Sequence, residues 1–161
     1  MRVSARLVGV LLLAPMTAFT QSGDALSLKG FYLGQDMAQC PAETVSVDNS
    51  QDGSITCNLG PTTFANRPAT AHAVMLAGGK VVGAAVWLPE RGFTASEPIR
   101  AALFEKFGRP TEYKPHVNEA SWRRGDEVLS FDGYRGNVLL VDLDALRRRA
   151  AAAAKTNKKD L

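Results

Sequence analysis

The sequence lacks the residue patterns on which most enzymes depend. Its 161 residues contain only two histidines, His72 and His116, and neither has a metal-binding partner at a recognisable spacing. The Gly-x-Ser-x-Gly nucleophile elbow, the His-Glu-x-x-His helix and the glycine-rich phosphate loop are all absent. We therefore predict no enzyme activity, no metal and no cofactor. The alternative is a small secreted hydrolase with an unrecognised carboxylate or histidine site.

Long apolar runs are also scarce, and the one that is present lies near the N-terminus. Residues 7–16 are uncharged and apolar, and Arg2 and Arg6 precede them. This run is too short to span a bilayer, and its position after basic residues is typical of a cleavable signal peptide. We predict a signal peptide over residues 1–20 and a periplasmic or secreted protein. The alternative is an N-terminal anchor helix.

Cysteine occurs only at Cys40 and Cys57. Their spacing does not match the Cys-x-x-Cys pattern of redox or zinc sites. In an exported protein, which enters an oxidising compartment, an even number of cysteines is usually paired. We therefore predict a structural disulfide between them, with a redox pair or metal ligands as alternatives. Because no cysteine follows the apolar run closely, we predict no lipidated N-terminus.

Positive charge is concentrated at the two ends of the chain. The whole chain carries 19 basic and 16 acidic residues, and without Arg2 and Arg6 the net charge falls to about +1. Residues 142–161 hold three acidic side chains and six basic ones, so the body is slightly acidic. We therefore predict no nucleic-acid binding. The tail is either a solvated extension or a weak contact to an anionic membrane surface. Its basic residues are Arg147, Arg148, Arg149, Lys155, Lys158 and Lys159.

Turn residues divide the mature chain into alternating short elements. Asp52-Gly53 and Gly78-Gly79 separate pairs of apolar segments and predict two hairpins. A helix is expected from Thr94 to Gly108, because its apolar residues recur at helical spacing. Thr94 and Glu97 have the spacing of an N-terminal capping box, and Pro110 prevents the helix from continuing. The prediction is a single α+β domain over residues 26–142, with an antiparallel sheet and helices on one face. A basic C-terminal helix and frayed tail follow over residues 143–161. The order of the expected elements resembles a tandem repeat of a helix and a meander. These elements are a short helix at 36–40, strands at 45–47, 55–59, 71–77 and 80–88, the long helix, strands at 120–123, 127–131 and 137–142, and the terminal helix.

One group of aromatic and basic residues is a candidate for partner binding. Arginine, tryptophan and tyrosine often anchor protein interfaces. The candidates are Trp122, Arg123, Arg124, Tyr134 and Arg135. The alternative is that Trp122 faces the core and the arginines are solvated.

Three short segments resemble a family of small periplasmic proteins. Residues 29–36 (KGFYLGQD) are similar to the opening segment of modules typified by the BamE (SmpA/OmlA) family and by the β-lactamase-inhibitor-protein fold. Gly108-Arg109-Pro110 resembles their helix ending, and Trp122 with residues 127–133 resembles a tryptophan strand and the hairpin after it. The resemblance implies a two-layer α/β module that binds a protein partner in the cell envelope through an open sheet face. Such a protein would be an envelope-assembly accessory or an inhibitor-like module.

Overall fold

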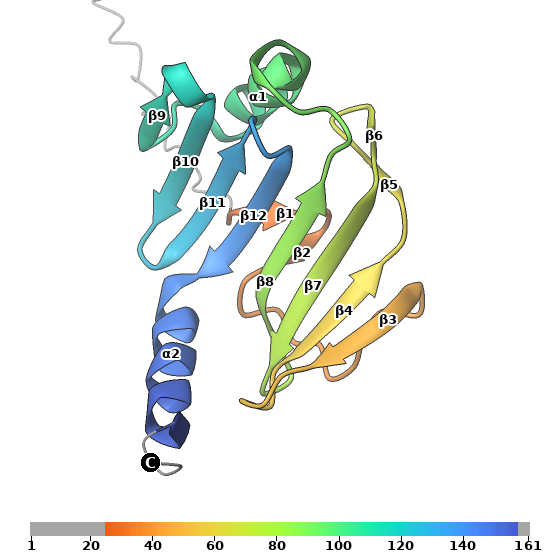
Figure 1. Ribbon diagram of the computed structural model, residues 1–161, viewed down its shortest axis with the longest axis vertical. Helices are drawn as coiled ribbons and strands as arrows, with labels where there is room; N and C mark the ends of the chain where they lie inside the picture. The colour runs from red at the N-terminus through yellow and green to blue at the C-terminus, as the bar shows by residue number, and fades with distance from the viewer. Residues whose placement is uncertain (1–24, 158–161) are drawn as a thin grey trace, which may run out of the picture.

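The structure is a computed structural model that describes residues 25–157 (Figure 1). The predicted signal peptide, residues 1–20, lies outside the described residues. The strands are β1 (Ser27–Leu28), β2 (Phe31–Tyr32), β3 (Thr44–Asn49), β4 (Ile55–Leu59), β5 (Thr62–Phe64), β6 (Arg67–Ala69), β7 (Ala71–Ala77), β8 (Lys80–Trp87), β9 (Glu112–Lys114), β10 (Glu119–Arg124), β11 (Glu127–Asp132) and β12 (Asn137–Asp142). The helices are α1 (Phe93–Phe107), α2 (Leu143–Asn157) and a short 3₁₀ helix, Pro115–Val117.

Eight strands form one antiparallel sheet in the order β3-β4-β7-β8-β12-β11-β10-β9. Each half of the sheet is a local meander, and α1 connects the two halves. The halves join where β8 pairs with β12, with Trp87 opposite Asn137 and Gly83 opposite Val141. The predicted α+β class and both predicted hairpins are confirmed.

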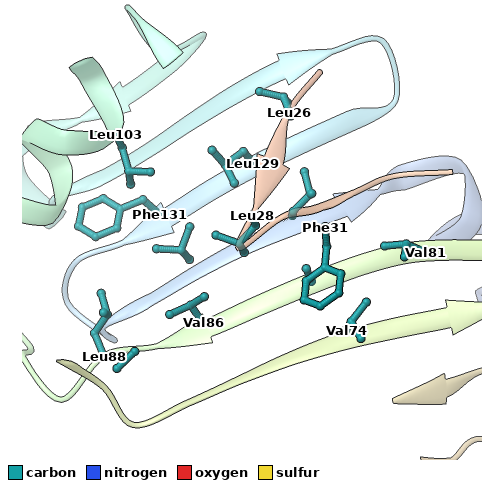
Figure 2. Close-up of a cluster of buried hydrophobic side chains, with 14 of the residues drawn as sticks. Leu26, Leu28, Phe31, Val74, Val81, Val86, Leu88, Leu103, Leu129 and Phe131 are labelled. Atoms are coloured by element: carbon teal, nitrogen blue, oxygen red, sulfur yellow. The ribbon is translucent and has the colours of Figure 1, made fainter. Parts of the chain in front are cut away.

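One face of the sheet carries the hydrophobic core (Figure 2). Helix α1 supplies Ile99 and Leu103 to this core, and the β1–β2 hairpin supplies Leu28 and Phe31. Burying one such side chain stabilises the fold by about 1.5–3 kcal/mol. The core side of the sheet contributes Val74, Val81, Val86, Leu129, Phe131, Val138 and Leu140.

Helix α1 has the predicted extent, with a different N-terminal cap. The residue before the helix is Gly92, and no side chain caps this end, although the sequence predicted Thr94 in that role. The C-terminal prediction is confirmed: Gly108 has a φ of 74°, and its N–H donates to the carbonyl of Phe104 at 2.9 Å. A positive φ costs little at glycine, which explains why the helix ends there.

The predicted short helix at residues 36–40 does not form. The segment instead extends along the start of β8, beyond the last residue that pairs with β12. The N–H of Gly34 donates to Val81 at 2.8 Å, and the N–H of Met37 donates to Gly79 at 2.8 Å. These backbone groups therefore bond to the sheet rather than within a helix, and the first half lacks the helix that a tandem repeat requires.

The C-terminal helix begins at the predicted residue and lies differently from α1. Asp142 Oδ1 accepts hydrogen bonds from the N–H groups of Asp144 and Ala145 at 2.9 and 3.0 Å, which caps α2. The helix continues past the end of β12 (Figure 1). Its Leu146 borders the face of the sheet opposite the core. The core face is covered by α1, by the β1–β2 hairpin and by the segment that carries Met37 and Cys40, whose side chains pack against the core.

Candidate binding surface

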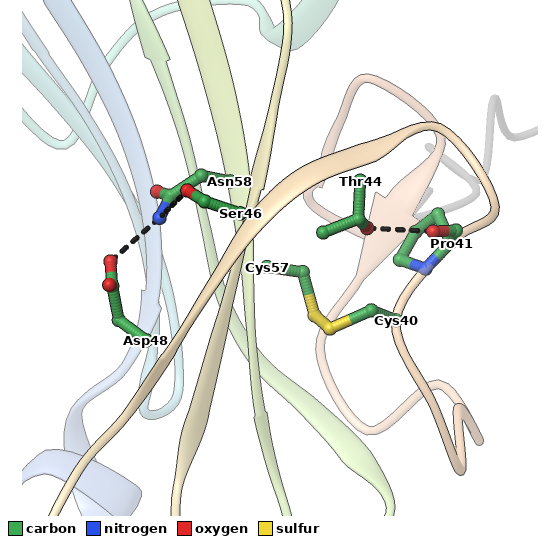
Figure 3. Close-up of a disulfide and its surroundings, with 7 residues drawn as sticks. All are labelled: Cys40, Pro41, Thr44, Ser46, Asp48, Cys57 and Asn58. Atoms are coloured by element: carbon green, nitrogen blue, oxygen red, sulfur yellow. Dashed lines mark hydrogen bonds between the residues drawn. A yellow bond between two sulfur atoms is a disulfide. The ribbon is translucent and has the colours of Figure 1, made fainter.

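A disulfide joins Cys40 to Cys57, as predicted (Figure 3). Cys57 is fully buried in β4, and Cys40 lies in the irregular segment before β3, with their Cα atoms 5.6 Å apart. The bond therefore fastens that segment to the sheet on its core side. Disulfides of this kind are a feature of proteins in oxidising compartments.

The two histidines lie in different elements of the fold. His72 lies in β7, where its Nδ1 is 2.9 Å from the carbonyl oxygen of Gly60. His116 lies in the 3₁₀ helix. Among the described residues, no group of three histidine, cysteine or acidic side chains is arranged to hold a metal ion.

Trp122 belongs to the core. Only 4% of the residue is exposed, and its ring meets Phe104 edge-on at 5.7 Å and also contacts Phe107. Its Nε1 donates to the carbonyl oxygen of Gly108 at 2.9 Å, which satisfies the polar atom of the buried indole. Trp122 therefore faces the core, which was the alternative to a role in partner binding, and its side chain cannot anchor a partner in this conformation.

The other four candidate residues lie at opposite ends of β11. Arg123 and Arg124 flank the β10–β11 turn, whereas Tyr134 and Arg135 lie in the β11–β12 turn. A six-residue strand separates the two turns by about 20 Å. The five predicted residues therefore do not form one surface, although Tyr134 is 74% exposed.

The three consecutive arginines of α2 pair with carboxylates of the same chain. Arg147 contacts Asp126 at 3.1 Å, Arg148 pairs with Asp144 one turn earlier, and Arg149 pairs with Asp52 in the β3–β4 turn. Lys158 and Lys159 of the predicted basic tail lie outside the described residues. No described helix is long and apolar enough to cross a membrane.

Asp52 connects the β3–β4 turn to α2. Its carboxylate accepts hydrogen bonds from the Oγ and the N–H of Ser54 at 2.8 and 3.1 Å, and from Arg149. Arg149 also contacts the sulfur of Met75 on β7. The hydrogen bonds from Ser54, with a smaller contribution from Arg149, lower the pKa of Asp52 from 3.8 to about 2.

Replacing Asp52 with asparagine should therefore have an effect that depends on pH. Because the carboxylate has a lower pKa in the folded chain, it stabilises the fold above about pH 4 and loses this effect as the pH falls towards 2. Urea unfolding should show Asp52→Asn less stable than the wild type near neutral pH, with the difference shrinking over that acid range. Ser54→Ala removes the hydrogen bond that contributes most to the lowered pKa of Asp52, so it should narrow the pH range over which this difference in stability changes. A difference that stayed constant down to pH 2 would contradict this origin.

The face of the sheet opposite the core holds an apolar hollow of about 350 Å³. Its floor consists of the small residues Ala73, Gly83 and Ala85 on the two central strands β7 and β8. Larger side chains border it, and two of them are well exposed, Trp87 at 39% and Leu146 at 38%. Met75, Leu139 and Val141 also border it. We call this surface the apolar hollow.

A polar hollow of about 310 Å³ adjoins the apolar hollow on the same face. Leu139 lines both of them. In the polar hollow Lys114 lies 3.3 Å from Glu112 and 3.6 Å from Glu119, and its pKa is raised, mainly by the hydrogen bond to Glu112. Arg135 pairs with Asp132 at 3.6 Å. The open face therefore combines an apolar hollow with an adjoining polar hollow, whose lining holds three carboxylates and two basic groups.

The sequence contained a signal for the apolar hollow that strand periodicity alone does not show. Residues 71–77, 81–87 and 138–141 are non-polar at nearly every position rather than at alternate ones. Such runs indicate strands that are covered on both faces. One face of these strands meets the core, and the other lines the hollow, with no described element lying across it.

Comparison of the chain with family models, with curated proteins and with solved structures finds no match. The similarity to BamE-like modules therefore stays a prediction from short motifs.

Proposed function

We propose that the protein is an exported, non-catalytic binding protein that contacts a protein partner in the cell envelope through its open sheet face. The apolar hollow is the observation that carries this proposal. A central apolar pocket surrounded by a polar border is the usual composition of a protein interface. Binding energy in such interfaces comes mainly from a few large side chains that fill a central pocket.

The chemistry of the face favours a particular kind of partner segment. The small residues on the floor leave room for an apolar side chain between Trp87 and Leu146. The neighbouring carboxylates Glu112, Glu119 and Asp132 favour a partner that carries a basic group beside the apolar one. We therefore propose a partner segment with an apolar anchor flanked by lysine or arginine.

The proposed location is the periplasm or the outside of the cell. The disulfide between Cys40 and Cys57 supports an oxidising compartment. The predicted signal peptide and the similarity to periplasmic modules agree with this location. An envelope-assembly accessory and an inhibitor-like module both fit a protein of this kind.

Site-specific photo-crosslinking in the native compartment tests the proposal. A photoreactive amino acid at Trp87 should capture a partner that mass spectrometry can identify, and the same group at Ala101, on the exposed side of α1, should not. Capture alone is insufficient, so the identified partner must then bind the purified protein in a titration.

In that titration, replacing Ala85 with arginine should weaken binding by about tenfold or more, because the side chain fills the floor of the hollow and adds positive charge. Ala101→Arg is the matched control, since it makes the same change at an exposed site. Circular dichroism and thermal unfolding should confirm that both variants fold. If the two variants bind the partner equally well, the open face is not the binding surface.

A further inference from the structure

The two edges of the sheet are protected to very different degrees. Strand β9 is only three residues long and carries Glu112 and Lys114, which are paired with each other. Strand β3 is six residues long, contains no proline, lysine or arginine, and departs from a regular register with β4 only between Thr44 and Ser46. Val45 and Val47 on it are 70% and 47% exposed. Natural proteins usually shield a long sheet edge with basic residues, proline or a covering segment, because its unpaired backbone groups can pair with another strand.

The one charge on β3 is directed away from the free edge. The side-chain Nδ2 of Asn58, on the neighbouring strand β4, donates to Asp48 Oδ2 at 2.7 Å and to Ser46 Oγ at 3.2 Å (Figure 3). Asp48 is therefore held over the sheet. The same contacts help to hold β3 in position against β4. Residues 46–49 therefore form an ordered edge that can pair with another strand, because the register irregularity is confined to the start of β3.

We infer that β3 is a dimer interface, at which β3 of one copy pairs antiparallel with β3 of a second copy to form one continuous sheet. This arrangement uses the unprotected edge of both copies and leaves the short, charged β9 edges outermost. The dimer is also a closed assembly that cannot grow further, because both copies contribute the same edge to the interface. Pairing of β3 with β9 would instead continue from copy to copy as a filament.

The sequence of β3 is complementary to itself in one register. A two-fold axis perpendicular to the sheet requires one residue to face its own copy. When that residue is Val47, Asp48 of each copy faces Ser46 of the other. Two β-branched side chains then lie at the centre, and each carboxylate lies opposite a hydroxyl group rather than a second carboxylate, so no like charges face each other. Centring the pairing on Asp48 would oppose two like charges.

Sedimentation and light scattering of the purified, oxidised full chain over a concentration series test the inference. We expect the wild type to shift from monomer to dimer as the concentration rises. Val47→Lys should raise the dissociation constant of the dimer by about tenfold or more, because it opposes two like charges at the centre of the pairing. Val117→Lys, at another exposed valine outside β3, should leave the dissociation constant unchanged.

A mixture of two variants tests the register directly. The Val47→Lys and Val47→Glu chains should each be mainly monomeric alone and should form a mixed dimer together, because opposite charges then face each other at residue 47. Circular dichroism verifies that each chain is folded. A wild type that stays monomeric, a dimer that Val47→Lys does not weaken, or charge variants that fail to associate would each overturn the inference.

Discussion

Asn118→Ala should lower the free energy of unfolding by about 3 kcal/mol. The residue is 1% exposed and has a φ of 52°, in the left-handed region. Its Nδ2 donates to Ser96 Oγ at 2.7 Å and to the carbonyl oxygen of Phe93 at 3.3 Å. Alanine would remove both hydrogen bonds and would be more strained at this φ than asparagine, which adopts it comparatively well.

This residue connects three segments that are distant in sequence. The backbone carbonyl of Asn118 accepts the N–H of Gly133 at 3.0 Å, and the carbonyl of Gly133 accepts the N–H of Gly92 at the start of α1. A Cβ atom on Gly133 would lie 2.5 Å from Asn118 Nδ2 and from Ser96 Oγ. Gly133→Ala should therefore also destabilise the fold, by about 1–3 kcal/mol, because the buried site has no room for a methyl group.

Urea unfolding of a second variant separates the two causes. Asn118→Gly removes the side-chain hydrogen bonds but tolerates the positive φ, so it should be destabilised less than Asn118→Ala in proportion to the backbone strain. Equal stability of the two variants would mean that the strain contributes nothing. Wild-type stability in both would contradict the role of Asn118 as a connector.

Cys40→Ser should lower the stability of the oxidised protein by about 2–4 kcal/mol. The two cysteines are separated by 17 positions, and closing a loop of that size removes freedom from the unfolded chain. Position 40 is the better one to change, because Cys40 is half-buried whereas Cys57 is fully buried. A serine at position 57 would add the cost of burying a hydroxyl group.

The same unfolding experiment with a reductant provides the control. Reduction should bring the wild type close to the stability of Cys40→Ser and should leave the variant itself unchanged. Free thiols in protein purified from its native compartment would show that the bond is not part of the working molecule.

Local patterns were sufficient to predict most of the sheet and the long helix. Gly78-Gly79 and Asp52-Gly53 predicted the two hairpins because a tight turn needs residues that accept a positive φ. Gly108 and Pro110 predicted the end of α1 for a similar local reason. The disulfide followed from an even number of cysteines in a chain expected to be exported.

Features that depend on distant parts of the chain could not be predicted from local patterns. Residues 36–40 have a helix-capping aspartate, but the free side of β8 offers their backbone groups better-placed partners. The group around Trp122 looked contiguous because its members are close in sequence, whereas a strand pair places them at two ends of the sheet. The apolar hollow needed the sheet order, since its floor and border come from β7, β8, β12 and α2.

In the proposed dimer, the edge position of β3 would also determine how many partners one assembly can hold. A two-fold axis perpendicular to the sheet keeps both open faces on the same side, so a β3-paired dimer presents two apolar hollows towards one surface. A partner that displays two suitable segments could occupy both at once, and the first contact would raise the effective concentration for the second. Such bivalent binding can exceed single-site affinity by roughly 10²–10⁴ without any new contact. A weak individual site would then be enough to retain a multivalent partner in the envelope.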